Sequence, residues 1–290
     1  MAKSRRSRRR RKTSSSVGDV IKVFAILIVI VSIIAGGFFV WWNQENIETN
    51  KSDLCPTDGA RATVAILLDT TDDIAPVTKT DIQNRTAELL NELPRFYRVS
   101  LYTLNEDGLN PTPIATLCNP GRLDEMGKLE RDGYTANPQM IKDKYSKFQQ
   151  NMSKAIDQTL GQKFDAQQSP LLGSLQNLSL LLPKPVELDA EKYLAGTNKI
   201  ILISDLLEFT PVYSMYVQNT NLKSFQNSKA GEKFGKQYDE DIEIWQVQRN
   251  RLGISNKKLK KLWLDIFDKE FGYSIYRDPP LTITPLVGLE

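Results

Sequence analysis

The sequence predicts an α/β domain with a doubly wound, mostly parallel sheet, preceded by one transmembrane helix. Three observations support this prediction: an unbroken apolar run near the N-terminus, short β-branched runs that stop at an aspartate, and amphipathic helical patterns between those runs. Strands that alternate with helices form a parallel sheet covered on both faces, and such sheets place their sites at the carboxyl ends of the strands.

The apolar run spans residues 23–42, VFAILIVIVSIIAGGFFVWW, in which Ser32 is the only polar side chain. Twenty helical residues at about 1.5 Å each span about 30 Å, the hydrocarbon thickness of a bilayer. The two tryptophans at its end suit the membrane interface. A cleaved signal peptide is the alternative, but its apolar stretch is usually only about 7–15 residues long. We therefore expect a retained anchor whose partner is the lipid bilayer.

A basic tail, residues 1–22, precedes this run. It holds nine Lys or Arg and one Asp, a net charge of +8, which leaves −5 for the rest of a chain whose total is +3. The positive-inside rule keeps such a tail in the cytoplasm and places the main domain outside, which in a bacterium means an inner-membrane protein with a periplasmic domain. No aromatic residue interleaves the arginines to stack on bases, so we expect a topology signal and no nucleic acid partner.

Two features of the composition limit the chemistry. The chain has no histidine, which excludes Ser-His-Asp and Cys-His nucleophiles as well as imidazole zinc sites. Its two cysteines, Cys55 and Cys118, lie far apart and outside any C-x-x-C pair. They form either one disulfide in an oxidising compartment or two unreactive thiols, and the placement of the domain outside favours the disulfide.

The expected elements begin after a polar juxtamembrane linker at residues 43–60. A continuous aliphatic and β-branched run is typical of a buried parallel strand. In the first half of the domain, residues 61–290, we expect a strand at 63–68, a helix at 77–93, a hairpin of strands 97–104 and 112–117, and a charged loop at 122–142.

The second half of the domain again alternates helices with strands. Ser169 is the expected N-cap of a helix with Pro170 at its first position. The other expected elements are an amphipathic helix at 145–160, a buried strand at 199–204, a long exposed insertion at 213–238, a strand at 241–247, a helix at 259–267 and a surface strand or loop after Arg277.

Three motifs stand at the ends of these elements. VAILLDTTDD places Asp69, Thr71 and Asp73 directly after a strand, SPLLGSL places Ser169 before a helix, and IILISDLLE ends a strand at Asp205. Together they resemble the von Willebrand factor A-like domain family over residues 61–275. The first is similar to its D-x-S-x-S loop, the second to its T-P-L segment and the third to its strand that ends in an aspartate. The hairpin suits the antiparallel edge of that fold.

The resemblance implies a metal-ion-dependent adhesion site. In such a site, hydroxyls and carboxylates of three loops hold a divalent cation, and an acidic group of a partner protein completes its shell. The implied ligands are Asp69, Thr71, Asp73, Ser169 and Asp205. Mg²⁺ prefers such hard oxygen ligands, and Mn²⁺ and Ca²⁺ are the other candidates.

Asp73 departs from the family, because it replaces the second serine. Its extra negative charge would hold a cation more tightly but leave it less electrophilic toward a partner's acid. Alternatively, Asp73 caps the following helix and no metal binds.

An enzymatic alternative starts from Asp69. It also fits the nucleophile of a Mg²⁺-dependent phosphatase of the haloacid dehalogenase-like type, although Thr71 stands where such enzymes typically have an acid. We therefore expect no enzyme but a membrane-anchored scaffold that recruits another protein, part of a membrane-associated complex, with Mg²⁺ at the site. A metal-free structural subunit of such a complex and the phosphatase are the alternatives.

Overall fold

The chain divides into two compact units, residues 1–45 and residues 46–290. A computed structural model describes residues 17–42, 47–104, 111–127, 137–162, 166–188, 193–216, 220–235, 238–249, 254–273 and 277–288.

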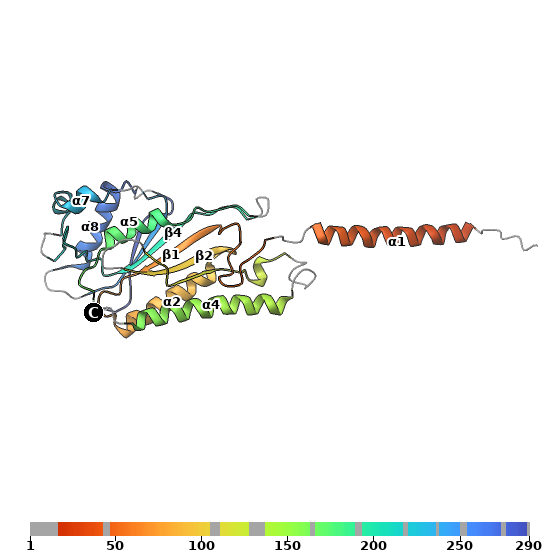
Figure 1. Ribbon diagram of the computed structural model, residues 1–290, viewed down its shortest axis with the longest axis horizontal. Helices are drawn as coiled ribbons and strands as arrows, with labels where there is room; N and C mark the ends of the chain where they lie inside the picture. The colour runs from red at the N-terminus through yellow and green to blue at the C-terminus, as the bar shows by residue number, and fades with distance from the viewer. Residues whose placement is uncertain are drawn as a thin grey trace, which may run out of the picture. The chain divides into compact units, whose positions relative to one another are not determined.

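The first unit contains one long helix, α1, Val17–Trp42 (Figure 1). Its segment Ile21–Phe39 is long and apolar enough to cross a membrane, and none of it is buried against protein. A helix long and apolar enough to span a membrane is thus present, as predicted. A signal sequence near an N-terminus can meet the same criteria, so retention of the helix in a membrane stays a prediction.

Six strands of the described chain form one sheet in the second unit, in the order β3-β2-β1-β4-β5-β6. All neighbouring strands are parallel except β3, which pairs antiparallel to β2 at one edge. The strands are β1 (Ala62–Leu68), β2 (Tyr97–Thr103), β3 (Ala115–Cys118), β4 (Lys199–Ser204), β5 (Asp241–Gln246) and β6 (Thr282–Pro285).

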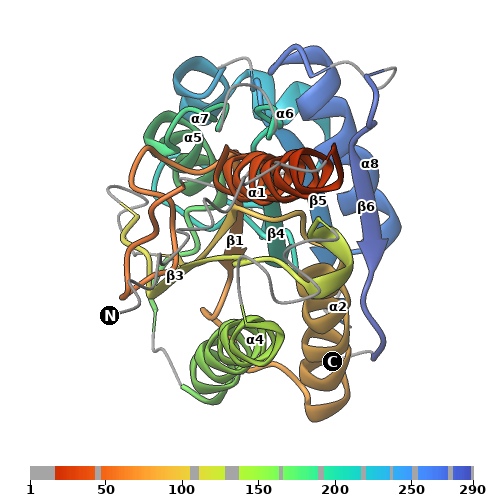
Figure 2. The ribbon, with the colours of Figure 1, turned by 90° about the vertical axis from the view of Figure 1, so that its right-hand side faces the viewer.

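Helices cover both faces of this sheet, as predicted. Figure 2 shows α2 (Pro76–Glu92) and α4 (Pro138–Gly161) on one side and α5 (Leu171–Leu181) and α8 (Asn256–Lys269) on the other. The alternating side chains of β1 supply both cores: Val64, Ile66 and Leu68 pack with α2 and α4, whereas Ala65 and Leu67 pack with α5 and α8. Burial on both faces explains why β1 reads as a continuous apolar run.

The start of α4 corrects one expectation. The predicted charged loop at 122–142 contains a short 3-10 turn, η1 (Leu123–Glu125), and residues 128–136 lie outside the described chain. Helix α4 begins at Pro138, seven residues before the predicted start, and the side chain of Asn137 accepts a hydrogen bond from the Gln139 N–H. Ile141 is the one buried residue of its first two turns, too weak a signal to show the periodicity.

The predicted exposed insertion at 213–238 is also wrong in its described part. It carries two short helices, α6 (Leu222–Gln226) and α7 (Lys229–Lys233), and buries six apolar side chains in the core on the α5 and α8 side. These are Tyr213, Met215, Phe225, Ala230, Phe234 and Tyr238. Their spacing follows no period, because they reach the core from two short helices and from the segments around them rather than from one long helix.

The segment predicted as a linker, residues 43–60, is in part a folded piece of the domain. Residues Thr49 and Pro56 pair as an antiparallel bridge, and Cys55 and Ala60 are buried. The expected disulfide between Cys55 and Cys118 is present and ties this segment to the end of β3. The segment is therefore anchored to the sheet edge, while residues 43–46 lie outside the described chain.

Candidate functional site

The candidate site lies at the carboxyl ends of the central strands β1 and β4. These strands are parallel neighbours, with Leu68 opposite Ile203, and the backbone N–H of Asp69 donates to the Ile203 carbonyl at 2.9 Å. From β1 the chain places β2 on one side and β4 on the other, so this is the point where the strand order reverses. Open α/β sheets bind ligands at such a point.

Asp69 is held in place by hydroxyl groups from three segments. Its Oδ1 accepts hydrogen bonds from the Thr71 hydroxyl at 2.7 Å and from the Thr71 N–H at 3.1 Å. Its Oδ2 accepts one from Ser204 at 2.7 Å and a long one from Ser169 at 3.5 Å. The side chain is 6% exposed, so Asp69 acts here as a buried acceptor that joins the ends of β1, β4 and the start of α5.

Ser169 reaches this cluster through a short pairing with the loop after β4. Its N–H donates to the Phe209 carbonyl at 2.8 Å, and the Phe209 N–H donates to the Ser169 carbonyl at 3.0 Å. Helix α5 starts at Leu171 with Pro170 as its N-cap residue, one position later than predicted, and the Pro170 side chain makes no capping hydrogen bond. The Ser169 hydroxyl instead donates a long hydrogen bond to Asp69, whereas the resemblance implied that Ser169 is a metal ligand, which stays a prediction.

Asp205 follows β4 directly and forms an ion pair with an arginine. Its Oδ1 accepts the Leu207 N–H at 3.0 Å, and its Oδ2 lies 2.8 Å from the Nε of Arg249. Between these residues, Leu206 has a positive φ of 67°, which turns the chain sharply after the strand. Asp205 is therefore fixed by its own loop and by a cation from the loop after β5.

Asp73 is the predicted ligand whose place differs most from the expectation. It is exposed and does not line the pocket, whereas its neighbour Asp72 does. The Asp73 carbonyl accepts a hydrogen bond from Arg249 Nη1 at 3.0 Å. The N-cap residue of α2 is Ala75, so Asp73 does not stand at the N-cap position that its alternative role as a helix cap requires.

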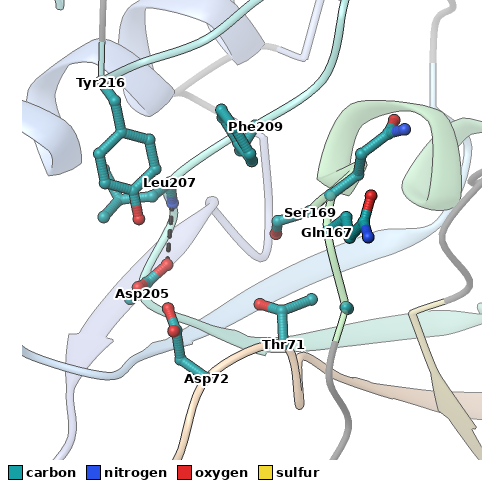
Figure 3. Close-up of a pocket in the computed structure, with 10 residues that line it drawn as sticks. Thr71, Asp72, Gln167, Ser169, Asp205, Leu207, Phe209 and Tyr216 are labelled. Atoms are coloured by element: carbon teal, nitrogen blue, oxygen red, sulfur yellow. Dashed lines mark hydrogen bonds between the residues drawn. The ribbon is translucent and has the colours of Figure 1, made fainter.

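A pocket of about 420 Å³ opens beside this cluster (Figure 3). Two aromatic side chains stand at one wall: Phe209 and Tyr216 are 42% and 41% exposed and stack edge to face with their centroids 5.6 Å apart. The pocket is lined by Thr71, Asp72, Ala166, Gln167, Gln168, Ser169, Asp205, Leu207, Phe209 and Tyr216. It thus combines polar side chains from three loops with an exposed aromatic pair.

Three of the predicted ligands, Thr71, Ser169 and Asp205, line this one pocket, and Asp69 accepts hydrogen bonds from two of them, Thr71 and Ser169. Sequence reasoning missed Asp72, Arg249 and the aromatic pair. Arg249 follows β5 by three residues, so the rule that pointed to the ends of β1 and β4 applies to it as well. No sequence pattern indicated that Phe209 and Tyr216 belong to the site, because they lie outside the helices and strands that hydrophobic periodicity predicts.

The residues do not fit a divalent cation in this arrangement. No group of three or more Asp, Glu or Cys side chains in the described chain is placed to hold a metal ion. A magnesium site also needs carboxylate oxygens directed at the ion at about 2.1 Å. Here Asp205 Oδ2 faces the guanidinium of Arg249, and both oxygens of Asp69 accept hydroxyl hydrogen bonds. The Mg²⁺ site stays a prediction, with this geometry against it.

The same contacts bear on the phosphatase alternative. A nucleophilic carboxylate must present an oxygen lone pair to the substrate. Asp69 is almost fully buried, and each of its oxygens accepts a hydrogen bond of 2.7 Å from a hydroxyl. No observation at the site favours this alternative.

A second buried carboxyl, Glu208, lies behind the pocket between the lining residues Leu207 and Phe209. Its side chain is fully buried, and Oε2 accepts the Leu172 N–H in the first turn of α5 at 2.9 Å. Burial raises the pKa of Glu208 to about 8. Burial, and then the charge of Glu208, raise the pKa of Tyr213 to about 12. Glu208 is therefore largely protonated at neutral pH and gives the loop after β4 a neutral, buried core.

Comparisons with known proteins give little guidance here. No family model and no curated protein matches the chain. Among solved structures, proximal thread matrix protein 1 from the mussel byssus is similar over 78% of this chain and 44% of its own, with a TM-score of 0.36 and 8% identity. The human COPII-coat protein Sec24c is similar over 78% and 30%, with a TM-score of 0.34 and 10% identity. The chain thus spans less than half of either protein, and likeness at these scores carries no argument.

Proposed function

We propose that this protein is a membrane-anchored scaffold whose outer domain, of von Willebrand A-like type, recruits another protein at the pocket beyond β1 and β4. The observation that carries the proposal is the exposed aromatic pair of Phe209 and Tyr216 on the wall of that pocket. Aromatic side chains are enriched at the centres of protein interfaces, because they bury much area with little loss of side-chain entropy.

The sheet supports the assignment to this type of domain. The resemblance implied a parallel sheet with one antiparallel edge, and β3 is antiparallel at the edge of an otherwise parallel sheet. The implied rim residues Asp69, Ser169 and Asp205 come from the ends of two strands and the start of a helix.

The anchor supports the placement at a membrane. Helix α1 is long enough to span a bilayer, and the basic residues before it favour a cytoplasmic N-terminus with the domain outside, in a bacterium the periplasm. A scaffold held in this way meets partners that are themselves at the membrane, and its loop face needs no catalytic group.

The test is site-specific photo-crosslinking of the full chain in the cells that make it. A photoreactive phenylalanine analogue at position 209 or 216 should give one discrete adduct of higher mass with a second protein. The matched controls are positions 180 and 181, where Leu180 and Leu181 are 59% and 57% exposed and lie outside the pocket. Adducts that are equally strong at all four positions, or none at the pocket, would count against recruitment there.

A further inference from the structure

The loop after β5 supplies a cation to the site. Arg249 stands three residues beyond the end of β5, and its side chain is only 13% exposed. The Val247 N–H donates to the Ser204 carbonyl, and the Asn256 amide donates to the Arg249 carbonyl at 3.3 Å. The backbone of Arg249 is therefore positioned by the end of β4 and by the start of α8.

The Arg249 guanidinium contacts two of the three loops that the resemblance assigns to the metal. Its Nε lies 2.8 Å from Asp205 Oδ2, in the loop after β4. Its Nη1 donates to the Asp73 carbonyl at 3.0 Å, in the loop after β1. A guanidinium carries several donors in a rigid plane, which lets one side chain join two acceptors that lie on different loops.

A divalent cation and this guanidinium compete for the same carboxylate. The Asp205 side chain is 7% exposed, and its other oxygen already accepts the Leu207 N–H. A metal ion at Asp205 would therefore have to displace the arginine or lie within a few ångströms of its positive charge. Like charges at that separation in a partly buried site repel strongly.

We infer that Arg249 takes the place of a divalent cation at this rim, so that the chain itself supplies the positive charge that joins the loops after β1, β4 and β5. The three loops are then held together without any metal. The site binds divalent cations weakly because the Arg249 guanidinium occupies the position beside Asp205. This inference concerns how the rim is built and goes beyond the proposed function, whose partner it does not specify.

The experiment measures Mn²⁺ binding by the full chain in detergent micelles, from the loss of the six-line electron paramagnetic resonance signal of the free ion. The wild-type chain should leave the signal unchanged at millimolar Mn²⁺. Arg249→Gln removes the charge and keeps a donor, and it should bind about one equivalent at least tenfold more tightly than the wild type. Adding Asp205→Asn to Arg249→Gln should abolish that binding.

The matched control is Arg277→Gln. Arg277 also joins a carboxylate, Asp241, and backbone carbonyls, but at the opposite end of β5. This variant should behave as the wild type does.

Two outcomes would overturn the inference. The first is a wild-type chain that binds one Mn²⁺ at micromolar concentration and loses it in Asp69→Asn. The second is a folded Arg249→Gln variant that gains no affinity. If Arg249→Gln does not fold, the melting temperature of the wild type in Mg²⁺ and in chelator decides: equal values support the inference, and a rise of several degrees that Asp205→Asn removes overturns it.

Discussion

The carboxyl group of Glu208 accepts the backbone N–H of Leu172 at 2.9 Å while no part of its side chain reaches solvent. This contact joins the loop after β4, which lines the pocket, to the first turn of α5, the helix that follows the pocket-lining residues 166–169. The helix N-terminus favours a charged carboxylate, but the loss of hydration outweighs it and raises the pKa from 4.5 to about 8.

The stability of the unit Asn46–Glu290 should therefore depend on Glu208 between about pH 4.5 and pH 8. In this range the folded chain binds a proton that the unfolded chain has lost, so the contribution is complete below pH 4.5 and falls as the pH rises. The loss from pH 5 to pH 8 should be about 3 kcal/mol. Urea unfolding at several pH values measures it. Glu208→Gln should remove this slope, whereas Glu88→Gln, on the exposed face of α2, should retain it.

The ion pair of Asp205 and Arg249 gives a second prediction. Arg249→Gln should lower the free energy of unfolding by about 3–5 kcal/mol, because it leaves a poorly hydrated carboxylate without its cation. Asp205→Asn in the same chain should restore part of that loss, with a coupling energy of at least about 1 kcal/mol in a double-mutant cycle. Strictly additive losses in urea unfolding would mean that the two side chains do not interact.

The disulfide gives a third prediction. Cys55 and Cys118 are 63 residues apart in sequence, so the bond closes a long loop in the unfolded chain. In the chain-entropy model, Cys55→Ser with Cys118→Ser should lower the free energy of unfolding by about 4 kcal/mol. A reductant should destabilise the wild type by a similar amount and leave the double variant unchanged. Free thiols in protein taken from its own cells would contradict the placement in an oxidising compartment.

The strands and the rim could be predicted from the sequence because their signals are local. The buried runs at β1 and β4 stop at Asp69 and Asp205, and parallel strands bring their carboxyl ends to one edge whatever the details of packing. The predicted bounds of these two strands agree with the structure to within one residue. The hairpin was also recognisable, since β2 and β3 pair antiparallel.

The parts that failed depend on contacts between distant segments. Phe225 is buried against Tyr213, and Tyr238 against Phe267, so the polar stretch around them gave no sign of their burial. Arg249 is one of two arginines that follow β5 closely in the sequence, and only the fold brings it to Asp205. Aspartates at the ends of β1 and β4 are expected both in a metal site and in a site where an arginine replaces the metal. The aspartates alone therefore could not distinguish between these two kinds of site.

Retention of the apolar helix is the last prediction. A signal peptidase needs a short apolar region followed by small residues, whereas the run from Ile21 to Phe39 is followed by two tryptophans. The chain in the membrane fraction should therefore keep its full mass of 32.9 kDa and resist extraction by alkaline carbonate. Ile30→Arg with Ile34→Arg should release it, because each charge at the bilayer centre costs about 2.5–3.5 kcal/mol, whereas Ile30→Leu with Ile34→Leu should not. A lighter, soluble wild-type chain that lacks residues 1–42 would make the helix a signal sequence.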